Sequence, residues 1–155
     1  MKKTILLIAL VLGLSYSSSY AQYKNAIGGR FGLANGLSFK TFNKSNKAFD
    51  FILNFQSKND YDDFQFTALY EIHNPINNAD GLRWYYGVGG DIGSRRYKAT
   101  EEKTMLLGVD GVLGLDYKFR DAPINLALDW KPNFILSPNT EVDGTDIGIY
   151  IRFTF

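Results

Sequence analysis

Cysteine is absent from this chain of 155 residues, histidine occurs once and proline four times. Without cysteine an exported protein has no disulfide framework, no thiol chemistry and no thiolate metal site. One histidine and no cysteine leave carboxylates as metal ligands, which favours at most a weak site for a hard cation. We therefore predict no metal centre, and the scarcity of proline leaves room for long strands.

The sequence also lacks an excess of charge of either sign. It has 17 basic and 16 acidic residues, and two of the basic ones, Lys2 and Lys3, lie at the very start. This near balance gives no electrostatic basis for binding nucleic acid. The glycine clusters at residues 28–29 and 87–90 are not followed by a helical pattern, so they are not phosphate loops, and we predict no cofactor.

Long apolar runs are missing except near the N-terminus. Residues 5–14 form an apolar run that follows Lys2 and Lys3 and precedes the small-residue exit Ser19-Tyr20-Ala21. This pattern is typical of a cleaved secretory signal peptide, and the run is too short to span a bilayer as a helix. We predict a signal peptide at residues 1–21 and a mature domain at residues 22–155. Since no cysteine borders the cleavage site, the chain is not a lipoprotein.

The C-terminal stretch, residues 145–155, alternates strictly between apolar and polar side chains. A strand places alternate residues on opposite faces, so this stretch has one apolar face, made of Ile147, Ile149, Ile151, Phe153 and Phe155. Exposed on a soluble protein, such a strand invites aggregation, whereas in a closed barrel its apolar face meets lipid. The ending resembles the C-terminal signal by which bacterial outer-membrane barrels are recognised for insertion, with Tyr150, Phe153 and Phe155 as its residues.

The same alternation recurs along the chain between clusters of turn residues. It predicts eight strands, at residues 23–33, 37–42, 48–56, 64–72, 82–93, 105–119, 124–131 and 145–155. We expect a tight turn at Ala34-Asn35-Gly36, loops at residues 57–63 and 94–104, and a bulge or strand end at Pro132. The even number predicts an all-β, closed, antiparallel, eight-stranded up-and-down transmembrane barrel, with the connections after the second, fourth and sixth strands facing the periplasm.

The two faces of these strands differ in charge. Seven cations are predicted to point inward: Lys24, Arg30, Lys40, Arg83, Lys118, Lys131 and Arg152. Seven carboxylates are predicted to point the same way: Asp50, Glu71, Asp91, Asp110, Asp116, Asp129 and Asp146. Buried charges need partners, and turn geometry favours the pairs Lys40–Asp50, Glu71–Arg83 and Lys131–Asp146. Aromatic residues near the periplasmic strand ends would form an interfacial girdle: Tyr23, Phe49, Tyr70, Trp84, Tyr117 and Phe153.

A soluble barrel of the lipocalin type is the alternative fold, because it shows the same alternation with the apolar face inside. The signal peptide, the terminal Phe155 and the outward aromatic residues favour the membrane barrel.

Four segments carry a resemblance to a known class: GGRFG at residues 28–32, LYEIHNP at 69–75, WYYGVGGDIG at 84–93 and LDWKP at 128–132. With them the mature chain resembles small outer-membrane barrels of the outer-membrane protein X and A class, and especially exported barrels of Bacteroidota. The resemblance implies a β-barrel in the outer membrane of a Gram-negative bacterium, and it implies no particular activity.

Catalytic chemistry finds little support in the sequence. His73 lies beside the Asn74-Pro75 turn, which we place at the periplasmic side, and Asp110 and Asp129 are better explained as members of an ion network. We predict no catalytic residue. The alternatives are a lipid-modifying enzyme, which needs a nucleophile and a base at the outer rim, and a narrow solute channel.

We expect a structural or binding role, in which a charged extracellular loop contacts a protein or lipopolysaccharide. The loop residues are Arg95, Arg96, Lys98, Glu101, Glu102 and Lys103. The other expected partners are outer-membrane lipid and the barrel-assembly machinery that acts during insertion.

Overall fold

The computed structural model describes residues 23–155, so the predicted signal peptide lies outside the described residues. In this part of the chain no helix is long and apolar enough to cross a membrane. The described residues form ten strands: β1 (Asn25–Gly32), β2 (Asn35–Lys44), β3 (Lys47–Ser57), β4 (Tyr61–Pro75), β5 (Leu82–Tyr97), β6 (Lys103–Lys118), β7 (Ile124–Trp130), β8 (Asn133–Ser137), β9 (Glu141–Asp143) and β10 (Ile147–Thr154).

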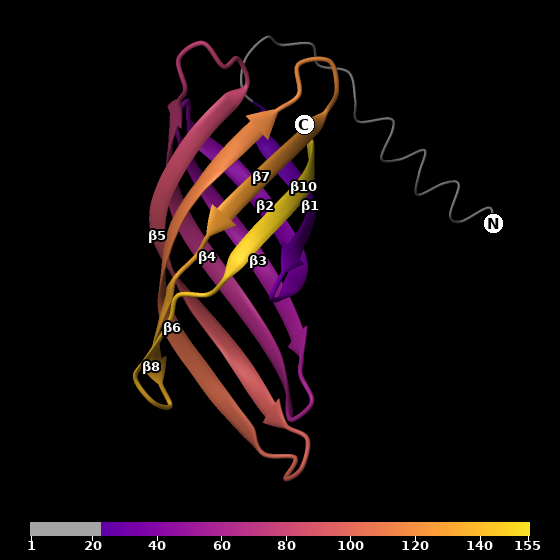
Figure 1. Cartoon of the computed structure of the whole chain (residues 1–155), viewed down its shortest axis with the longest axis vertical. Coiled ribbons are helices and arrows are strands. Elements are labelled where there is room, and N and C mark those ends of the chain that lie inside the picture. The colour runs from indigo at the N-terminus through magenta and orange to yellow at the C-terminus, as the bar shows by residue number, and fades with distance from the viewer. Residues whose placement is uncertain (1–22) are drawn as a thin grey trace, which may run out of the picture.

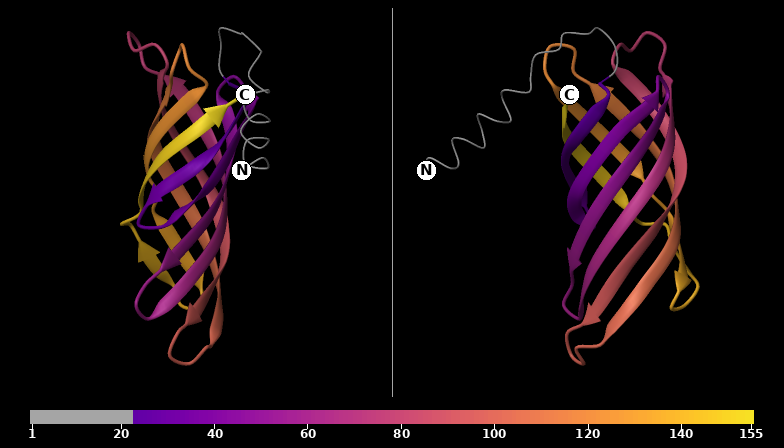
Figure 2. Two further views of the ribbon diagram at one scale, coloured as in Figure 1. Left: turned by 90° about the vertical axis from the view of Figure 1, so that its right-hand side faces the viewer. Right: turned by 180° about the vertical axis from the view of Figure 1, so that it is seen from behind.

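These strands close into a barrel in which every neighbour is antiparallel (Figures 1 and 2). Strands β1 to β6 pair in sequence order, and β10 returns to pair with β1 from Ala26↔Thr154 to Gly32↔Gly148. Strands β7 and β8 follow one another along β6, while β9 pairs with β8 and β10 with β7. Since β7 with β8 and β9 with β10 each occupy one strand position in the wall, the ten segments fill eight strand positions. The predicted eight-stranded up-and-down barrel is confirmed.

Pro132 separates β7 from β8, as the sequence predicts. Proline has no N–H to give to the ladder, so pairing with β6 stops at Trp130 and resumes at Asn133. The Pro132 carbonyl still accepts a hydrogen bond of 2.9 Å from the Gly111 N–H, which holds the segment between β7 and β8 against β6. The register shifts again between Leu107 and Gly108, where β8 continues the contact.

Side chains alternate along each strand between an apolar exterior and a polar interior. Large apolar side chains are exposed all round the barrel, and Val88, at 64 % exposure, is among the most exposed of them. An apolar surface of this extent is not stable in water and fits the hydrocarbon of a bilayer. The lipocalin-like alternative requires the reverse arrangement and is wrong. The chain is therefore a transmembrane β-barrel.

The middle of the lumen is filled by side chains. Ile52, Leu69 and Val112 pack there with Ala127 and the rings of Tyr85 and Tyr150. An eight-stranded barrel has an interior just wide enough for such packing.

We call the end of the barrel that carries the C-terminus the inner end, and the opposite end the outer end. The inner end carries the C-terminus and the connections at residues 45–46, 76–81 and 119–123; the outer end carries the β3–β4 and β5–β6 hairpins (Figure 1). The predicted loops at residues 57–63 and 94–104 exist but are shorter, at residues 58–60 and 98–102, because strand pairing continues to Ser57↔Asp62 and Arg96↔Lys103. The strands thus continue as paired hairpins beyond the apolar belt, although their side chains there are polar.

The predicted tight turn at Ala34-Asn35-Gly36 exists but lies one to two residues earlier in the chain. Asn35 and Gly36 belong to β2, and neither has a positive φ; the connection is Leu33-Ala34. The Asn35 Oδ1 atom accepts a hydrogen bond of 3.4 Å from the Gly32 N–H, so the side chain supports the connection from outside it.

Candidate functional site

Four cations lie fully inside the barrel: Arg30, Lys40, Lys131 and Arg152. Six carboxylates are buried with them: Asp50, Glu71, Asp91, Asp110, Asp116 and Asp129. Asp146 also faces this interior, with 16 % of its side chain exposed. The described interior therefore holds more carboxylates than cations, which the predicted balance of seven and seven did not foresee.

Lys40 is the centre of the charges near the inner end. Its Nζ lies 2.7 Å from Glu71 Oε2, 3.6 Å from Asp50 Oδ2 and 3.9 Å from Asp116 Oδ2. The same ammonium group lies 4.3 Å from the centre of the Tyr85 ring. One cation thus balances carboxylates from three strands and stacks on an aromatic face, which is what a desolvated charge requires.

Arg152 fills the lumen beside this group. Its Nη2 lies 2.6 Å from Asp50 Oδ2, and its Nε donates to the Ser38 hydroxyl at 2.8 Å. Its guanidinium carbon lies 4.0 Å from the centre of the Tyr150 ring. Because the Arg152 guanidinium is both hydrogen-bonded and stacked on an aromatic ring, it is held in one position and obstructs the lumen.

Arg30 and Lys131 hold the charges toward the outer end. Arg30 donates from Nη2 to Asp146 Oδ1 at 2.8 Å and from Nε to the Tyr150 hydroxyl at 2.9 Å. Lys131 Nζ lies 2.9 Å from Asp110 Oδ1 and 3.3 Å from Asp146 Oδ2. Asp146 therefore bridges the two cations.

The predicted partners differ from the observed ones in one pair. Lys40–Asp50 and Lys131–Asp146 lie within ion-pair distance. The Glu71–Arg83 pair is wrong: Glu71 binds Lys40, and Arg83 donates from Nη1 to the Ser45 carbonyl at 3.3 Å. In the register Arg83 faces Pro75 rather than Glu71, because β4 continues past the predicted end at residue 72 to Pro75, while β5 begins at Leu82 as predicted.

Two residues near the inner end were assigned to the wrong environment, whereas Lys118 is half-buried. Lys24 is exposed rather than inward. Tyr23 was placed in the outward girdle, but its hydroxyl donates to Asp116 Oδ2 at 3.0 Å and its ring packs 5.1 Å from Phe42. Both precede β1, so the alternation of the strand does not apply to them. Lys118 donates to the carbonyls of Phe119 and Ala122 and closes the β6–β7 turn.

His73 is not the turn residue that the sequence indicated. It lies within β4, buried in the lumen, with Nε2 2.8 Å from Glu71 Oε2 and its ring stacked 4.7 Å from that of Tyr85. The strand continues to Pro75 because proline is tolerated at the end of a strand, where its missing N–H does not affect the pairing of the residues before it. His73 thus shares Glu71 with Lys40, and it lies at the opposite end from the outer rim.

Acid–base chemistry is not supported by the two mid-strand aspartates. Asp110 is paired with Lys131, whereas Asp129 accepts a hydrogen bond of 3.0 Å from the Tyr85 hydroxyl. Among residues 23–155 no group of three or more histidine, cysteine, aspartate or glutamate side chains is arranged to hold a metal ion. Strand alternation places Ser38 and Gln65 on the inward face, but the predicted interior network contained charged residues alone. Asn133 follows Pro132 and lies outside the predicted strands, so alternation did not assign it to the interior.

The predicted contact loop is the tip of the β5–β6 hairpin and its flanks. Arg95 and Arg96 belong to β5 and Lys103 to β6, while Lys98, Glu101 and Glu102 lie in the connection. Arg95 forms a two-pronged contact with Asp63, with bonds of 2.8 and 2.7 Å, over the ring of Tyr61. Strand structure therefore fixes these cations instead of leaving them on a mobile loop.

An outward row of polar residues crosses three hairpin strands and the end of β3: Ser57, Asp62, Arg96 and Lys103, joined by the pairs Ser57↔Asp62, Asp62↔Arg96 and Arg96↔Lys103. We call it the outer rim. The Ser57 hydroxyl donates to Asp62 at 2.6 Å, and Arg96 Nη2 lies 2.9 Å from the same carboxylate. The Ser57 bond, followed by that of Arg96, lowers the pKa of Asp62 to about 2.

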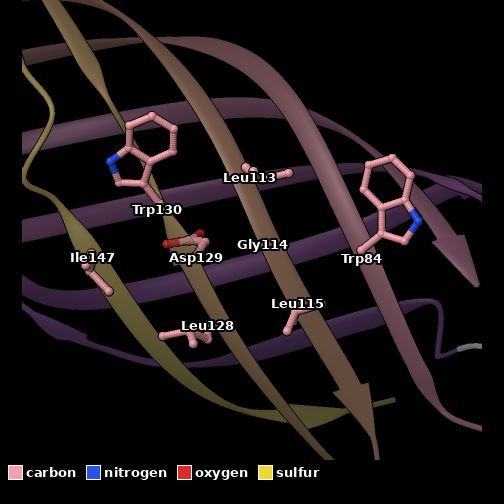
Figure 3. Close-up of a pocket in the computed structure, with 8 residues that line it drawn as sticks. All are labelled: Trp84, Leu113, Gly114, Leu115, Leu128, Asp129, Trp130 and Ile147. Carbon is pink, nitrogen blue, oxygen red and sulfur yellow. The ribbon is translucent and has the colours of Figure 1, made fainter. Parts of the chain in front are cut away.

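A shallow hollow of about 430 Å³ lies on the lipid-facing side, flanked by Trp84 on β5 and Trp130 on β7 (Figure 3). Leu113, Leu115, Leu128 and Ile147 complete its apolar lining. Trp130 donates from Nε1 to the Gly144 carbonyl at 2.7 Å, so its ring is fixed. The hollow therefore lies on the apolar exterior of the barrel wall.

The fold is shared with two solved structures. The N-terminal β-barrel domain of OprF from Pseudomonas aeruginosa matches with a TM-score of 0.64 and 14 % identity, over 84 % of this chain and 95 % of that one. Neisserial surface protein A, NspA, matches with a TM-score of 0.60 and 13 % identity, over 84 % and 93 %. No family model and no curated protein matches the sequence. The likeness at this identity is one of fold.

Proposed function

We propose that this chain is a non-enzymatic outer-membrane barrel with a structural role, and that its outer rim binds phosphate groups of outer-leaflet lipid such as lipopolysaccharide. The observation that carries the proposal is the cross-strand pair Arg96↔Lys103, two cations side by side on the outward face. The next outward residues toward the bilayer are Phe64, Ser94 and Met105, so the cations lie directly above the apolar belt.

The charges of the outer rim favour an anion. Asp62 is neutralised by Arg96 at 2.9 Å and by Lys98 at 3.2 Å. Lys103 forms no ion pair with any residue of the described chain, which leaves its ammonium group for a ligand. A groove of about 740 Å³ joins Arg96 and Lys103 to the rings of Phe55 and Phe64. A phosphorylated lipid matches both parts, with its headgroup on the cations and its chains on the rings.

A solute channel is disfavoured by the filled lumen. The side chains of Tyr85, Tyr150, Arg152 and Lys40 are completely or almost completely buried across its middle. Moving them would break ion pairs in a medium of low dielectric constant, which costs several kcal/mol for each pair. Purified protein in planar bilayers should therefore give no stepwise currents.

Lipid-modifying chemistry is disfavoured by the outer rim itself. The candidate nucleophile of the outer rim is the Ser57 hydroxyl, which donates to Asp62. The candidate base, His73, lies near the inner end on β4. A nucleophile without a base in reach is not activated.

The test compares two pairs of cations on neighbouring strands. Arg96→Ala with Lys103→Ala removes the outer-rim pair, and Lys44→Ala with Lys47→Ala removes a cross-strand lysine pair at the inner end. Lipopolysaccharide retained by each purified barrel is measured after extraction in mild detergent. We expect the outer-rim variant to bind roughly tenfold more weakly or worse, since a charge-assisted hydrogen bond is worth ~1.5–3 kcal/mol. The inner-end variant should bind as the native protein does.

Equal retention by the two variants would contradict lipid binding at the outer rim. Loss of a co-purifying protein, with lipid retention unchanged, would replace the lipid by a protein partner. Turnover of lipopolysaccharide, detected as a mass change after incubation with the native barrel, would overturn the non-enzymatic role.

A further inference from the structure

A ring of inward polar side chains lies toward the outer ends of five strands. Register pairs its members as neighbours: Asn54↔Gln65, Thr67↔Asp91 and Asp110↔Asn133. Five of the six are buried, and Gln65 is half-buried. We call these six residues the outer polar ring: Asn54, Gln65, Thr67, Asp91, Asp110 and Asn133.

The outer polar ring contains buried polar atoms without hydrogen-bond partners. They are Asn54 Oδ1 and Nδ2, Thr67 Oγ1, Asp110 Oδ2 and Asn133 Oδ1. A buried polar atom left unpaired costs about 1–3 kcal/mol, so a fold rarely gathers several at one level. Four of these five atoms are oxygens, and they come from four different strands. Their common feature is that they can all accept, as the ligands of a cation do.

The charge of the outer polar ring leads to the same conclusion. Asp91 accepts from the side-chain amides of Gln65 and Asn133, and among the described lysines and arginines none pairs with it. Lys131 neutralises Asp110, but Asp146 shares this lysine and also takes Arg30. Three carboxylates thus face two cations, and one negative charge remains uncompensated in a water-poor site.

We propose that the outer polar ring binds a hard cation of the Ca²⁺ class, with Asp91 and Asp110 as the charged ligands. Amide and hydroxyl oxygens of Asn133, Thr67 and Asn54 supply the neutral ligands that calcium accepts beside carboxylates. The Asn133 amide now donates to both aspartates, at 2.5 and 2.9 Å, so turning it end for end brings Oδ1 to the same place. A Cβ at Gly108 would collide with Asp91 Oδ2 and the Asn133 amide, so glycine at this position lets both groups lie close to β6.

The site is independent of the outer rim, which lies outside the barrel wall. Two carboxylates, one of them shared with Lys131, make a weak site. We expect dissociation constants of ~0.1–1 mM, the range of weak extracellular calcium modules. Bound calcium would satisfy the unpaired oxygens and close the outer end of the lumen.

The test measures calcium bound to the full mature chain, refolded in detergent and freed of metal with a chelator. Equilibrium dialysis against CaCl2 at constant ionic strength gives the stoichiometry, and the loss of the folded, fast-migrating band on heating gives the stability. We expect one saturable Ca²⁺ per barrel and a higher midpoint of heat unfolding. Asp91→Asn should abolish both, whereas Asp80→Asn, at an exposed carboxylate in the inner-end connection, should change neither.

Thr67→Val keeps every charge and removes one neutral ligand, so it tests the site even where Asp91→Asn does not fold. It should weaken calcium binding several-fold. Absence of saturable binding up to ~10 mM CaCl2, about tenfold above the ~1 mM end of the expected range, would overturn the proposal. Unchanged binding in both Asp91→Asn and Thr67→Val would overturn it as well, and would assign the bound calcium to the surface.

Discussion

Arg152 on β10 and Asp50 on β3 form an ion pair of 2.6 Å between strands that are not neighbours in the barrel wall. Strands β1 and β2 lie between them, and Ser38 of β2 bonds both partners, accepting from Arg152 Nε at 2.8 Å and donating to Asp50 at 2.7 Å. The pair therefore ties the last strand to the third across the lumen, independently of the backbone ladder that closes β10 on β1.

Breaking this pair should strongly destabilise the barrel. Arg152→Met leaves Asp50 buried, with Lys40 at 3.6 Å as its remaining cation. We expect a loss of ~3–5 kcal/mol in the free energy of unfolding, measured by urea titration of barrels in lipid vesicles. Arg120→Met is the control, because its ion pair with Asp80 is short but exposed and should be worth less than ~1 kcal/mol. Equal losses would show that the lumen pair contributes no more than a surface contact.

Gly148 makes room for the Arg30 guanidinium, and this gives a second prediction. A Cβ at Gly148 would lie 2.7 Å from Arg30 Nη2, whereas a Cβ at Gly144 would have nothing within 4 Å. Arg30 cannot retreat without breaking its bonds to Asp146 and Tyr150. Gly148→Ala should therefore cost ~1–3 kcal/mol of stability, the usual price of overpacking, while Gly144→Ala should cost almost nothing. The same urea titration compares them.

Period-two alternation was enough to predict which residues face inward, because lipid and lumen impose opposite demands on every strand. The alternation gave wrong assignments near the strand ends, where a residue no longer lies between lipid and lumen. Tyr23 and Lys24 precede the first strand, and His73 was assigned to a turn because of the adjacent Asn74-Pro75. The hairpin flanks at Asp62 and Arg96 were read as loops because their composition is polar, although both belong to strands.

The partners inside the lumen could not be predicted from turn counting alone. Lys40 and Asp50 face each other across one hairpin, so local register brings them together. Arg152 reaches Asp50 across two intervening strands, and Lys131 reaches Asp110 around the break at Pro132. Such contacts depend on the barrel's stagger and on side-chain length, which the order of residues in the sequence does not specify.

Labelling of single cysteines should report the faces and ends of the barrel, since the native chain has none. Val88→Cys is on the exposed apolar exterior and should react with a lipid-soluble maleimide but resist a water-soluble one. Thr100→Cys, at the β5–β6 tip, should react with the water-soluble reagent added to intact cells, and Asn77→Cys, in the inner-end connection, only after the outer membrane is opened. Reaction of Asn77→Cys in intact cells would reverse the assigned orientation.

Acid should loosen the outer rim at a low pH. The pKa of Asp62 is lowered to about 2, first by the Ser57 hydroxyl and then by Arg96. A carboxylate with a lowered pKa in the folded state stabilises it above the unfolded pKa of ~4 and loses that contribution as pH falls toward 2. Ser57→Ala should raise the pKa of Asp62, followed by the carboxyl carbon resonance in an NMR titration. An unchanged titration would mean that the Ser57 bond does not persist in solution.

Phe155 pairs with Asn25 in the structure and also belongs to the predicted insertion signal, and two substitutions should separate these roles. Its backbone exchanges two hydrogen bonds of 2.9 Å with Asn25, which closes the last rung between the two ends of the described barrel. Its ring is 47 % exposed and stacks 6.4 Å from that of Phe153, on the outside. Phe155→Ala keeps the rung and removes the ring, while Phe155→Tyr keeps both. If the ring is read by the assembly machinery, Phe155→Ala should lower the amount of folded barrel in cells, detected by heat-dependent migration. Refolding of the same variant from urea into detergent should stay near that of the native chain, because no machinery takes part. Normal assembly of Phe155→Ala in cells would remove the insertion signal, and equal failure in both settings would make the ring a structural contact instead.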